Sequence, residues 1–498
     1  MSDRHLKGQA LSGVRWIVTA RVLVQLITWP TTIVVMRLLH PHDYGIVAMA
    51  TIVIGFVALF GEPGLAAGLV QTQVLREDTS RAASGVILLL NLALLTALML
   101  AAPWVATWYR EPQLTLVIRV ASLSLLSTAI ATVPQALLQR NLRFREMALA
   151  LVAGNLGGCL ATVTLAFLDF GVWALVIGSL VISFMTSVVI IYYQGAVVWP
   201  SLSRGLEPVR HLVHFSAHIL GSRLLWYWSY SVDLIILGRL VPSSAVGSYS
   251  VGSNLAAIPG DKIMDALNRV SFPTLSRMRS DPARFSATAE RLLGLLALFG
   301  FAIAWGIAAV APEFVHVVLS DKWRLAVTPL VMLSIAAPIR MLWAFQYTVN
   351  IAAGFPAANT RVLTVCGVLL PIGILVGARA DGINGAAMSL VVVYPIVFLV
   401  STWLNCRATG GAMRDSLRQL VVPFVGGVCM LSAVSGTRAL LAARVPSIAL
   451  LCTEILIGAT VFLGAVRLIG PAVLVDARAL LRDLLRPGDQ AAAGLANP

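Results

Sequence analysis

Long apolar runs recur along almost the whole chain, and they restrict the fold more than any other feature of the sequence. About fourteen of them have roughly the 20 residues that a helix needs to cross a hydrocarbon core of about 30 Å. Hydrophobic residues make up 58% of the 498 residues and charged residues only 12%, about half the charged share of a soluble domain. Because lipid cannot satisfy an open backbone, the sequence predicts an all-α polytopic membrane protein.

The predicted spans fall into two sets of six and a final pair, separated by proline, glycine and charged residues. Their ranges are 14–38, 46–70, 85–107, 117–139, 147–168 and 171–193; then 212–238, 246–271, 289–311, 325–351, 361–379 and 382–404; and last 419–442 and 446–468.

An internal repeat relates the two sets of six. Residues 37–45 (RLLHPHDYG) align without a gap with residues 239–247 (RLVPSSAVG), 202 positions later. A weaker similarity relates Gly171-Val172 to Gly382-Ile383. Two such halves in the same orientation are the parallel-repeat plan of many transporters, whose site lies between the halves. We therefore predict an N-terminal half (1–204), a C-terminal half (205–404) and two extra helices with a tail (405–498).

The distribution of basic residues predicts the orientation in the membrane. Alternate loops carry 22 Lys and Arg residues on one side and 8 on the other, so the positive-inside rule places both termini in the cytoplasm. The net charge of +14 comes from scattered residues without the basic patch of a nucleic-acid-binding protein. We therefore expect no nucleic-acid partner.

Three segments carry a resemblance to a known family. Residues 34–50 (VVMRLLHPHDYGIVAMA), 135–145 (QALLQRNLRFR) and 231–240 (SVDLIILGRL) are similar in sequence and order to Wzx-type polysaccharide flippases. These proteins belong to the multidrug/oligosaccharidyl-lipid/polysaccharide exporter superfamily. The resemblance covers nearly the whole chain. The length of the chain and its arginine-rich composition resemble those of a xanthan-type exopolysaccharide flippase.

The resemblance implies a flippase of the bacterial inner membrane. Such a protein moves an undecaprenyl-pyrophosphate-linked oligosaccharide from the cytoplasmic to the periplasmic leaflet by alternating access, for exopolysaccharide or O-antigen synthesis. The expected partners are the lipid-linked oligosaccharide, membrane lipids, and the polymerase and export proteins of the same pathway. We expect no cofactor, no metal and no enzymatic activity.

Basic residues inside the apolar runs are candidates for binding the anionic head of such a lipid, because a charge in a membrane is costly unless it is paired or hydrated. Arg21 and Arg223 are again 202 positions apart, so each half contributes one. An arginine fork binds phosphate oxygens bidentately. We predict a cationic substrate site formed by Arg21, Arg223, Lys262 and Arg340. The alternative for Arg21 and Arg223 is that they snorkel to cytoplasmic water.

Acidic residues within the spans are candidates for coupling to a proton or cation. Asp261 and Asp265 follow Pro259-Gly260, a pair that we expect to interrupt the helix at 246–271. Glu62 precedes a similar Pro-Gly pair, and Asp233 lies in the seventh span. The alternatives are structural: Asp265 pairing with Arg269 at i,i+4 spacing, and Asp233 pairing with Arg223.

Two other functions remain open at this point. A membrane enzyme of polysaccharide assembly, such as a polymerase or transferase, needs an acid/base or metal constellation, and the sequence has no D-x-D and no phosphate-cradling glycine loop. A multidrug exporter of the same superfamily would be distinguished by an acidic rather than a cationic cavity.

Overall fold

The computed structural model describes residues 3–61, 65–71, 77–195, 200, 210–409 and 411–471. Every regular element among these residues is helical. The first part of the chain forms α1 (Asp3–Leu38), α2 (Pro41–Gly61), α3 (Leu65–Gln71), α4 (Glu77–Tyr109), α5 (Leu114–Ala121), α6 (Ser124–Arg140), α7 (Phe144–Phe167), α8 (Val172–Gln194) and α9 (Arg210–Leu240).

The second part contains α10 (Ser243–Arg277), α11 (Pro282–Phe314), a π-helical turn (Val315–Leu319), a 3₁₀ helix (Asp321–Ala326), α12 (Val327–Ala353), α13 (Pro356–Thr409), α14 (Met413–Leu441) and α15 (Ser447–Ile469). Eleven described segments are long and apolar enough to cross a membrane. One of these, Ala357–Arg407, contains two helices, and α9 and α10 add two more of 31 and 35 residues. The predicted set of about fourteen membrane helices is therefore confirmed.

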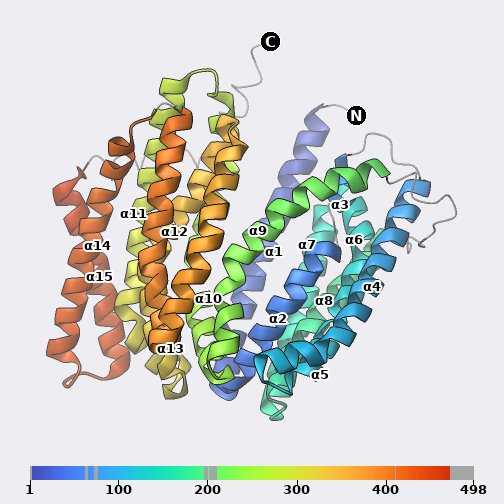
Figure 1. Cartoon of the computed structure of the whole chain (residues 1–498), viewed down its shortest axis with the longest axis horizontal. Coiled ribbons are helices and arrows are strands. Elements are labelled where there is room, and N and C mark those ends of the chain that lie inside the picture. The colour runs from blue at the N-terminus through green and yellow to red at the C-terminus, as the bar shows by residue number, and fades with distance from the viewer. Residues whose placement is uncertain are drawn as a thin grey trace. The chain divides into compact units, whose positions relative to one another are not determined.

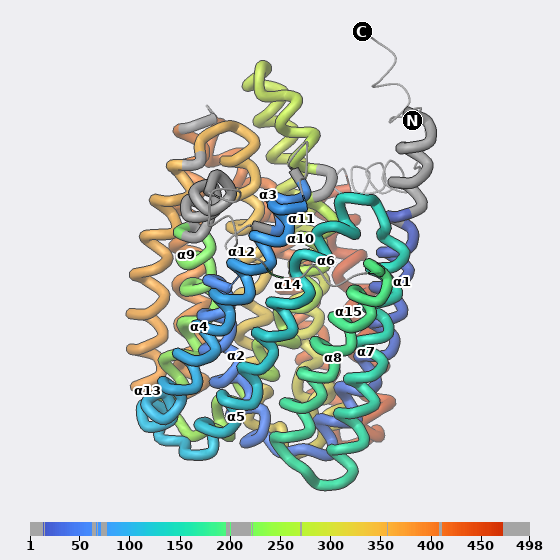
Figure 2. Tube along the Cα trace, turned by 90° about the vertical axis from the view of Figure 1, so that its right-hand side faces the viewer, coloured from blue at the N-terminus to red at the C-terminus, as the bar shows by residue number. Residues whose placement is uncertain are grey.

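The chain divides into two compact units, Met1–Ser250 and Val251–Pro498. The predicted boundary between the repeats, at 204/205, lies outside the described residues. Within the first unit α7 packs along α8 and α1 packs along α7 (Figure 2). A side-chain carbon at Gly158 would meet the carbonyl oxygen of Gly178 at 2.8 Å. Small residues therefore let these two backbones approach closely, as in other membrane helix pairs.

In the second unit α11 contacts more than one neighbour. It packs against α12 on one side and against both α14 and α15 on another (Figure 1). Its buried residues include Leu295, Phe301 and Trp305, and the rings of Phe301 and Trp305 both meet that of Phe424 on α14. Aromatic packing thus attaches the final helix pair to α11.

The repeat seen in the sequence is reproduced as a backbone contact inside the first unit. A side-chain carbon on Gly45 would meet the carbonyl oxygen of Ser243, and one on Gly247 would meet the carbonyl oxygen of Pro41. Both pairs of equivalent positions are 202 residues apart. The two glycines therefore make the same close contact in reciprocal directions, and neither position has room for a larger residue.

A second pair of repeat positions shares an unusual backbone conformation. Gly171 precedes α8 with φ 55° and ψ −127°, and Gly382 interrupts α13 with φ 52° and ψ −130°. This region is accessible almost only to glycine. The predicted separation of the spans at 361–379 and 382–404 is confirmed, because Asp381 and Gly382 are the two residues within α13 that leave the helical conformation.

The predicted helix interruption at Pro259-Gly260 is wrong. The helix α10 continues through both residues from Ser243 to Arg277. A proline removes one backbone hydrogen bond but does not by itself end a helix whose neighbours hold it. Here Gly260 is buried against Met341 of α12, whose Cγ and Sδ would lie 3.1 Å from an added side-chain carbon. The similar Pro-Gly pair that follows Glu62, at residues 63–64, lies outside the described residues.

Candidate functional site

A charged face on α10 is the most unusual surface of the second unit. Asp261, Lys262 and Asp265 are all exposed, and their spacing places them on neighbouring faces of one helical turn. The preceding Gly260 is buried. Because charged side chains avoid lipid, this face is suited to a hydrated surface rather than to the bilayer.

One contact joins this face to α12. Arg340 lies with its terminal nitrogen 3.8 Å from Oδ1 of Asp261, and the two side chains are 20% and 59% exposed. Two turns further along α10, the Thr348 hydroxyl of α12 donates a hydrogen bond to Asn268 Oδ1 at 3.0 Å. The structure thus supplies Asp261 as a carboxylate partner for Arg340. An ion pair of this length with a largely exposed carboxylate is weak.

The first unit contains the other two predicted cations. Arg21 is exposed on α1, and Arg223 is exposed on α9. Both belong to the unit that ends at Ser250, with α9 packed against α2. The guanidinium groups are thus accessible from outside this unit, as phosphate binding and snorkelling both require.

The acidic candidates differ in their surroundings. Asp233 is only partly exposed on α9, and the Tyr249 hydroxyl donates a hydrogen bond of 3.0 Å to its Oδ2. Since Tyr249 is completely buried, this contact anchors Asp233 to the start of α10. Asp265 is exposed, whereas the side chain of Arg269 and the whole of Glu62 lie outside the described residues.

A second group of charges, the Glu313–Arg438–Glu454 cluster, was not predicted as a site. It joins α11, α14 and α15. Arg438 donates to both carboxylate oxygens of Glu313, at 2.6 and 2.5 Å, and its Nε also lies 3.2 Å from Glu454 Oε1. Glu454 is fully buried. The sequence signal was available, because Glu454 is the sole acidic residue in the predicted span 446–468.

An apolar groove begins at this cluster and follows the same three helices. It has a volume of about 560 Å³ and is lined by aliphatic and aromatic side chains, with Glu454 as its charged member. Ile303, Ile455 and Leu463 are among the exposed lining residues. The groove is therefore open and suited to a hydrocarbon chain.

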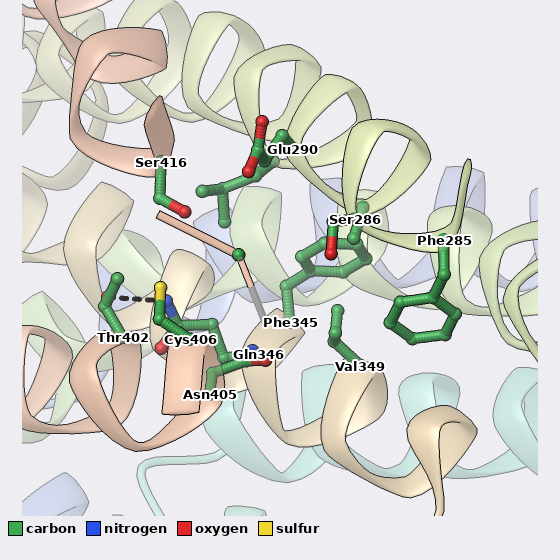
Figure 3. Close-up of a pocket in the computed structure, with 13 residues that line it drawn as sticks. Phe285, Ser286, Glu290, Phe345, Gln346, Val349, Thr402, Asn405, Cys406 and Ser416 are labelled. Carbon is green, nitrogen blue, oxygen red and sulfur yellow. Dashed lines mark hydrogen bonds between the residues drawn. The ribbon is translucent and has the colours of Figure 1, made fainter. Parts of the chain in front are cut away.

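A small polar pocket lies among α11, α12, α13 and α14 (Figure 3). Glu290 and Ser416 line one part of it, and Gln346 donates a hydrogen bond of 2.7 Å to Thr402 in another. Its volume of about 40 Å³ accommodates a few water molecules. The buried Oε1 of Gln346 accepts no hydrogen bond from the described residues, and a water there would satisfy it.

The fold and these charges on its long apolar helices define a class, that of multi-pass α-helical membrane proteins. Comparison with known sequences then identifies the family. The sequence profile described as "Polysaccharide biosynthesis protein" matches residues 34–328, more than half of the chain. The chain belongs to this family, which confirms the resemblance seen in the sequence.

Curated relatives extend the match over most of the chain. The succinoglycan biosynthesis transport protein ExoT of Rhizobium meliloti is 25% identical, over 95% of this chain and 94% of its own length. The lipopolysaccharide biosynthesis protein WzxC of Escherichia coli is 22% identical over 84% and 85%. The teichuronic acid biosynthesis protein TuaB of Bacillus subtilis is 24% identical over 84% and 86%.

Solved structures show the same fold. The lipid II flippase MurJ, in an inward closed conformation, superposes with a TM-score of 0.72 at 13% identity, over 96% of this chain and all of that chain. An inward-facing multidrug resistance transporter of the MATE family superposes with a TM-score of 0.58 at 15% identity, over 83% and 95%. At these identities the likeness concerns the fold alone.

Proposed function

We propose that this protein is a flippase that moves an undecaprenyl-pyrophosphate-linked oligosaccharide from the cytoplasmic to the periplasmic leaflet for exopolysaccharide or O-antigen synthesis. The observation that carries the proposal is the charged face of α10 with Arg340 on α12, which provides an exposed cation, Lys262, and a partly exposed one, Arg340. The family and the fold support it. Charges on helices of this kind are costly in lipid, and a hydrated path for an anionic cargo gives them a function.

The anionic head of the lipid is the part that the cations recognise. Arg21 and Arg223 bind pyrophosphate oxygens through their forked guanidinium groups, and Lys262 and Arg340 add positive charge from the second unit. In this proposal a phosphate of the head group replaces Asp261, which lies 3.8 Å from Arg340, as the partner of this arginine.

The hydrocarbon part of the substrate needs a different surface. The groove along α11, α14 and α15 is apolar over almost its whole lining, and its volume is about 560 Å³. Part of a polyprenyl chain seated there would replace lipid tails without exposing any polar group. The groove thus complements the cations, which bind the other end of the same molecule.

Alternating access moves the head group in this proposal. The two repeats rock so that the cations face the cytoplasm and then the periplasm. Asp233, Asp261, Asp265 and Glu62 are the proposed sites for the coupling proton or cation.

Analysis of lipid-linked intermediates in a deletion strain tests the proposed function. We expect polymer export to stop while complete lipid-linked repeat units accumulate on the cytoplasmic leaflet. Re-expression of the wild-type chain should restore export, and expression of an unrelated multi-pass protein should not. Incomplete repeat units in the deletion strain would instead identify the protein as a transferase and refute the flippase proposal.

The proposed orientation has its own test. Ser280 is exposed in the short connection between α10 and α11, on the side that the 22 to 8 division of basic residues assigns to the cytoplasm. A Ser280→Cys variant in a background without the native cysteines should be labelled by an impermeant maleimide only after cell lysis. Labelling in cells whose inner membrane is intact would reverse the orientation.

A further inference from the structure

The charges of the Glu313–Arg438–Glu454 cluster do not balance. Two carboxylates share one guanidinium, so full ionisation leaves one negative charge among helices that cross the membrane. An uncompensated charge in such a place costs several kcal/mol. The simplest way to remove this charge is to protonate one of the two carboxylates.

The hydrogen atoms of Arg438 show which carboxylate lacks a donor. Nε has a single hydrogen, and it is donated to Glu313 at 2.6 Å. The terminal nitrogen Nη2 has two hydrogens but three acceptors, namely the Ala309 carbonyl at 2.5 Å, Glu313 at 2.5 Å and Glu454 at 3.4 Å. Glu313 and Ala309 therefore receive the well-formed bonds.

Glu454 is left poorly satisfied as an anion. Its side chain is 0% exposed, and its Oε1 accepts no hydrogen bond from any described residue. The carboxyl groups of Glu313 and Glu454 both contact the guanidinium of Arg438 and are therefore neighbours. Two carboxyl groups can share a hydrogen bond only if one of them holds a proton. A protonated Glu454 donates to Glu313 and makes the cluster electrically neutral.

The remaining charged groups nearby do not alter this balance. Arg438 and Glu313 are the charged residues that act on Glu454 from α14 and α11. His316, in the π-helical turn after Glu313, is paired with Asp321 at 2.5 Å. The Arg438 side chain is 29% exposed, so a path to the outside exists on the arginine side.

We propose that the Glu313–Arg438–Glu454 cluster is a binding site for one exchangeable proton, held by Glu454 and shared with Glu313. The site lies at the ends of α11 and α14 and two turns into α15, near the face that the predicted topology assigns to the periplasm. Protons therefore enter from periplasmic water past Arg438. Because Glu454 also lines the apolar groove, a hydrocarbon chain in the groove excludes water and favours the protonated state.

Infrared difference spectroscopy of the full chain in lipid nanodiscs tests this inference without a transport assay. The carbonyl stretch of a carboxylic acid is separate from the bands of carboxylates and backbone amides. A pH titration of the wild-type protein should show a carboxylic-acid band that disappears as the pH rises and shifts in heavy water. Uniform labelling of glutamate with carbon-13 should move the same band.

Substitutions assign the band. Glu454→Gln should remove it, because the amide keeps the size and a hydrogen-bond donor but cannot titrate. If Glu454→Gln does not fold, Glu454→Asp serves instead: it keeps a carboxyl group on a shorter side chain and should retain a titrating band. Glu77→Gln is the matched control, since Glu77 is 76% exposed in an ion pair with Arg81, and the band assigned to Glu454 should remain in this variant.

Two results would overturn the inference. If the folded wild-type protein shows no titrating carboxylic-acid band, the cluster is fully ionised and purely structural. If the band persists unchanged in folded Glu454→Gln, the proton belongs to another residue. Neither result depends on the flippase proposal, which is tested separately by the analysis of lipid-linked intermediates.

Discussion

The second unit holds two groups of membrane charges that differ in almost every physical respect. On α10 and α12, Asp261 and Arg340 are partly exposed and lie 3.8 Å apart. In the Glu313–Arg438–Glu454 cluster the arginine forms bonds of 2.5 to 2.6 Å with one carboxylate, and the other is fully buried. The first pair is loosely bound and its carboxylate is exposed, whereas the cluster is tightly bound and its two carboxylates are largely or fully buried.

This difference separates charges that bind passing molecules from charges that hold helices together. A guanidinium that already makes short bidentate bonds to Glu313 cannot release them to a phosphate without leaving a buried carboxylate unpaired. An arginine that lies 3.8 Å from a largely exposed carboxylate loses little when it changes partners. The length of the ion pair and the exposure of its carboxylate therefore favour Arg340 over Arg438 as a contact for cargo.

The largest expected effect is on stability. Arg438→Gln leaves Glu313 and Glu454 without their counter-charge and should lower the free energy of unfolding by about 3 to 5 kcal/mol. The matched variant Arg340→Gln should change it by less than about 1 kcal/mol, because its ion pair is long and exposed. Thermal unfolding in detergent, followed by fluorescence-detected size exclusion, measures both. Equal losses would erase the distinction between the two groups of charges.

The next effect concerns Arg21 and Arg223, which are exposed and are not part of the buried cluster. The double Gln variant should reduce polymer export, normalised to membrane abundance, by about tenfold or more, since a charge-assisted hydrogen bond contributes about 1.5 to 3 kcal/mol. Lys at either position should restore export only in part, because it lacks the bidentate fork.

If both arginines merely snorkel to water, Lys will serve as well as Arg at each position. Near-normal export by the abundant double Gln variant would remove both residues from the mechanism.

The smallest expected effect is that of Asp261→Asn. Loss of a weak pair at 3.8 Å should leave thermal stability within about 1 kcal/mol of the wild type. Export should change by less than about fivefold, the equivalent of the same free energy, if Asp233, Asp265 or Glu62 binds the coupling proton or cation; a larger loss at wild-type stability would assign that role to Asp261. A collapse in stability would show that Asp261 and Arg340 are as structural as the cluster. Asp281→Asn, at the exposed N-cap of α11, provides a control for the loss of one acidic residue elsewhere.

Much of the architecture was determined by local sequence. Apolar runs of membrane-crossing length dictate helices, because no other open structure satisfies its backbone in lipid. The repeat could also be recognised from the sequence, since Gly45 and Gly247 are 202 residues apart. Each of these glycines lies close to a backbone carbonyl oxygen of the other repeat and has no room for a side chain. Gly171 and Gly382 were recognisable for a similar reason: only glycine adopts their conformation.

Tertiary structure alone decided how the charges are used. Arg438 lies within the predicted span 419–442, but the sequence does not indicate that Glu313, 125 positions earlier, and Glu454, 16 positions later, surround it. It also predicted a break at Pro259 that the packing of Gly260 against Met341 helps to prevent. Helix formation depends on neighbours along the chain, whereas pairing and burial depend on which helices meet, and only the folded structure specifies that.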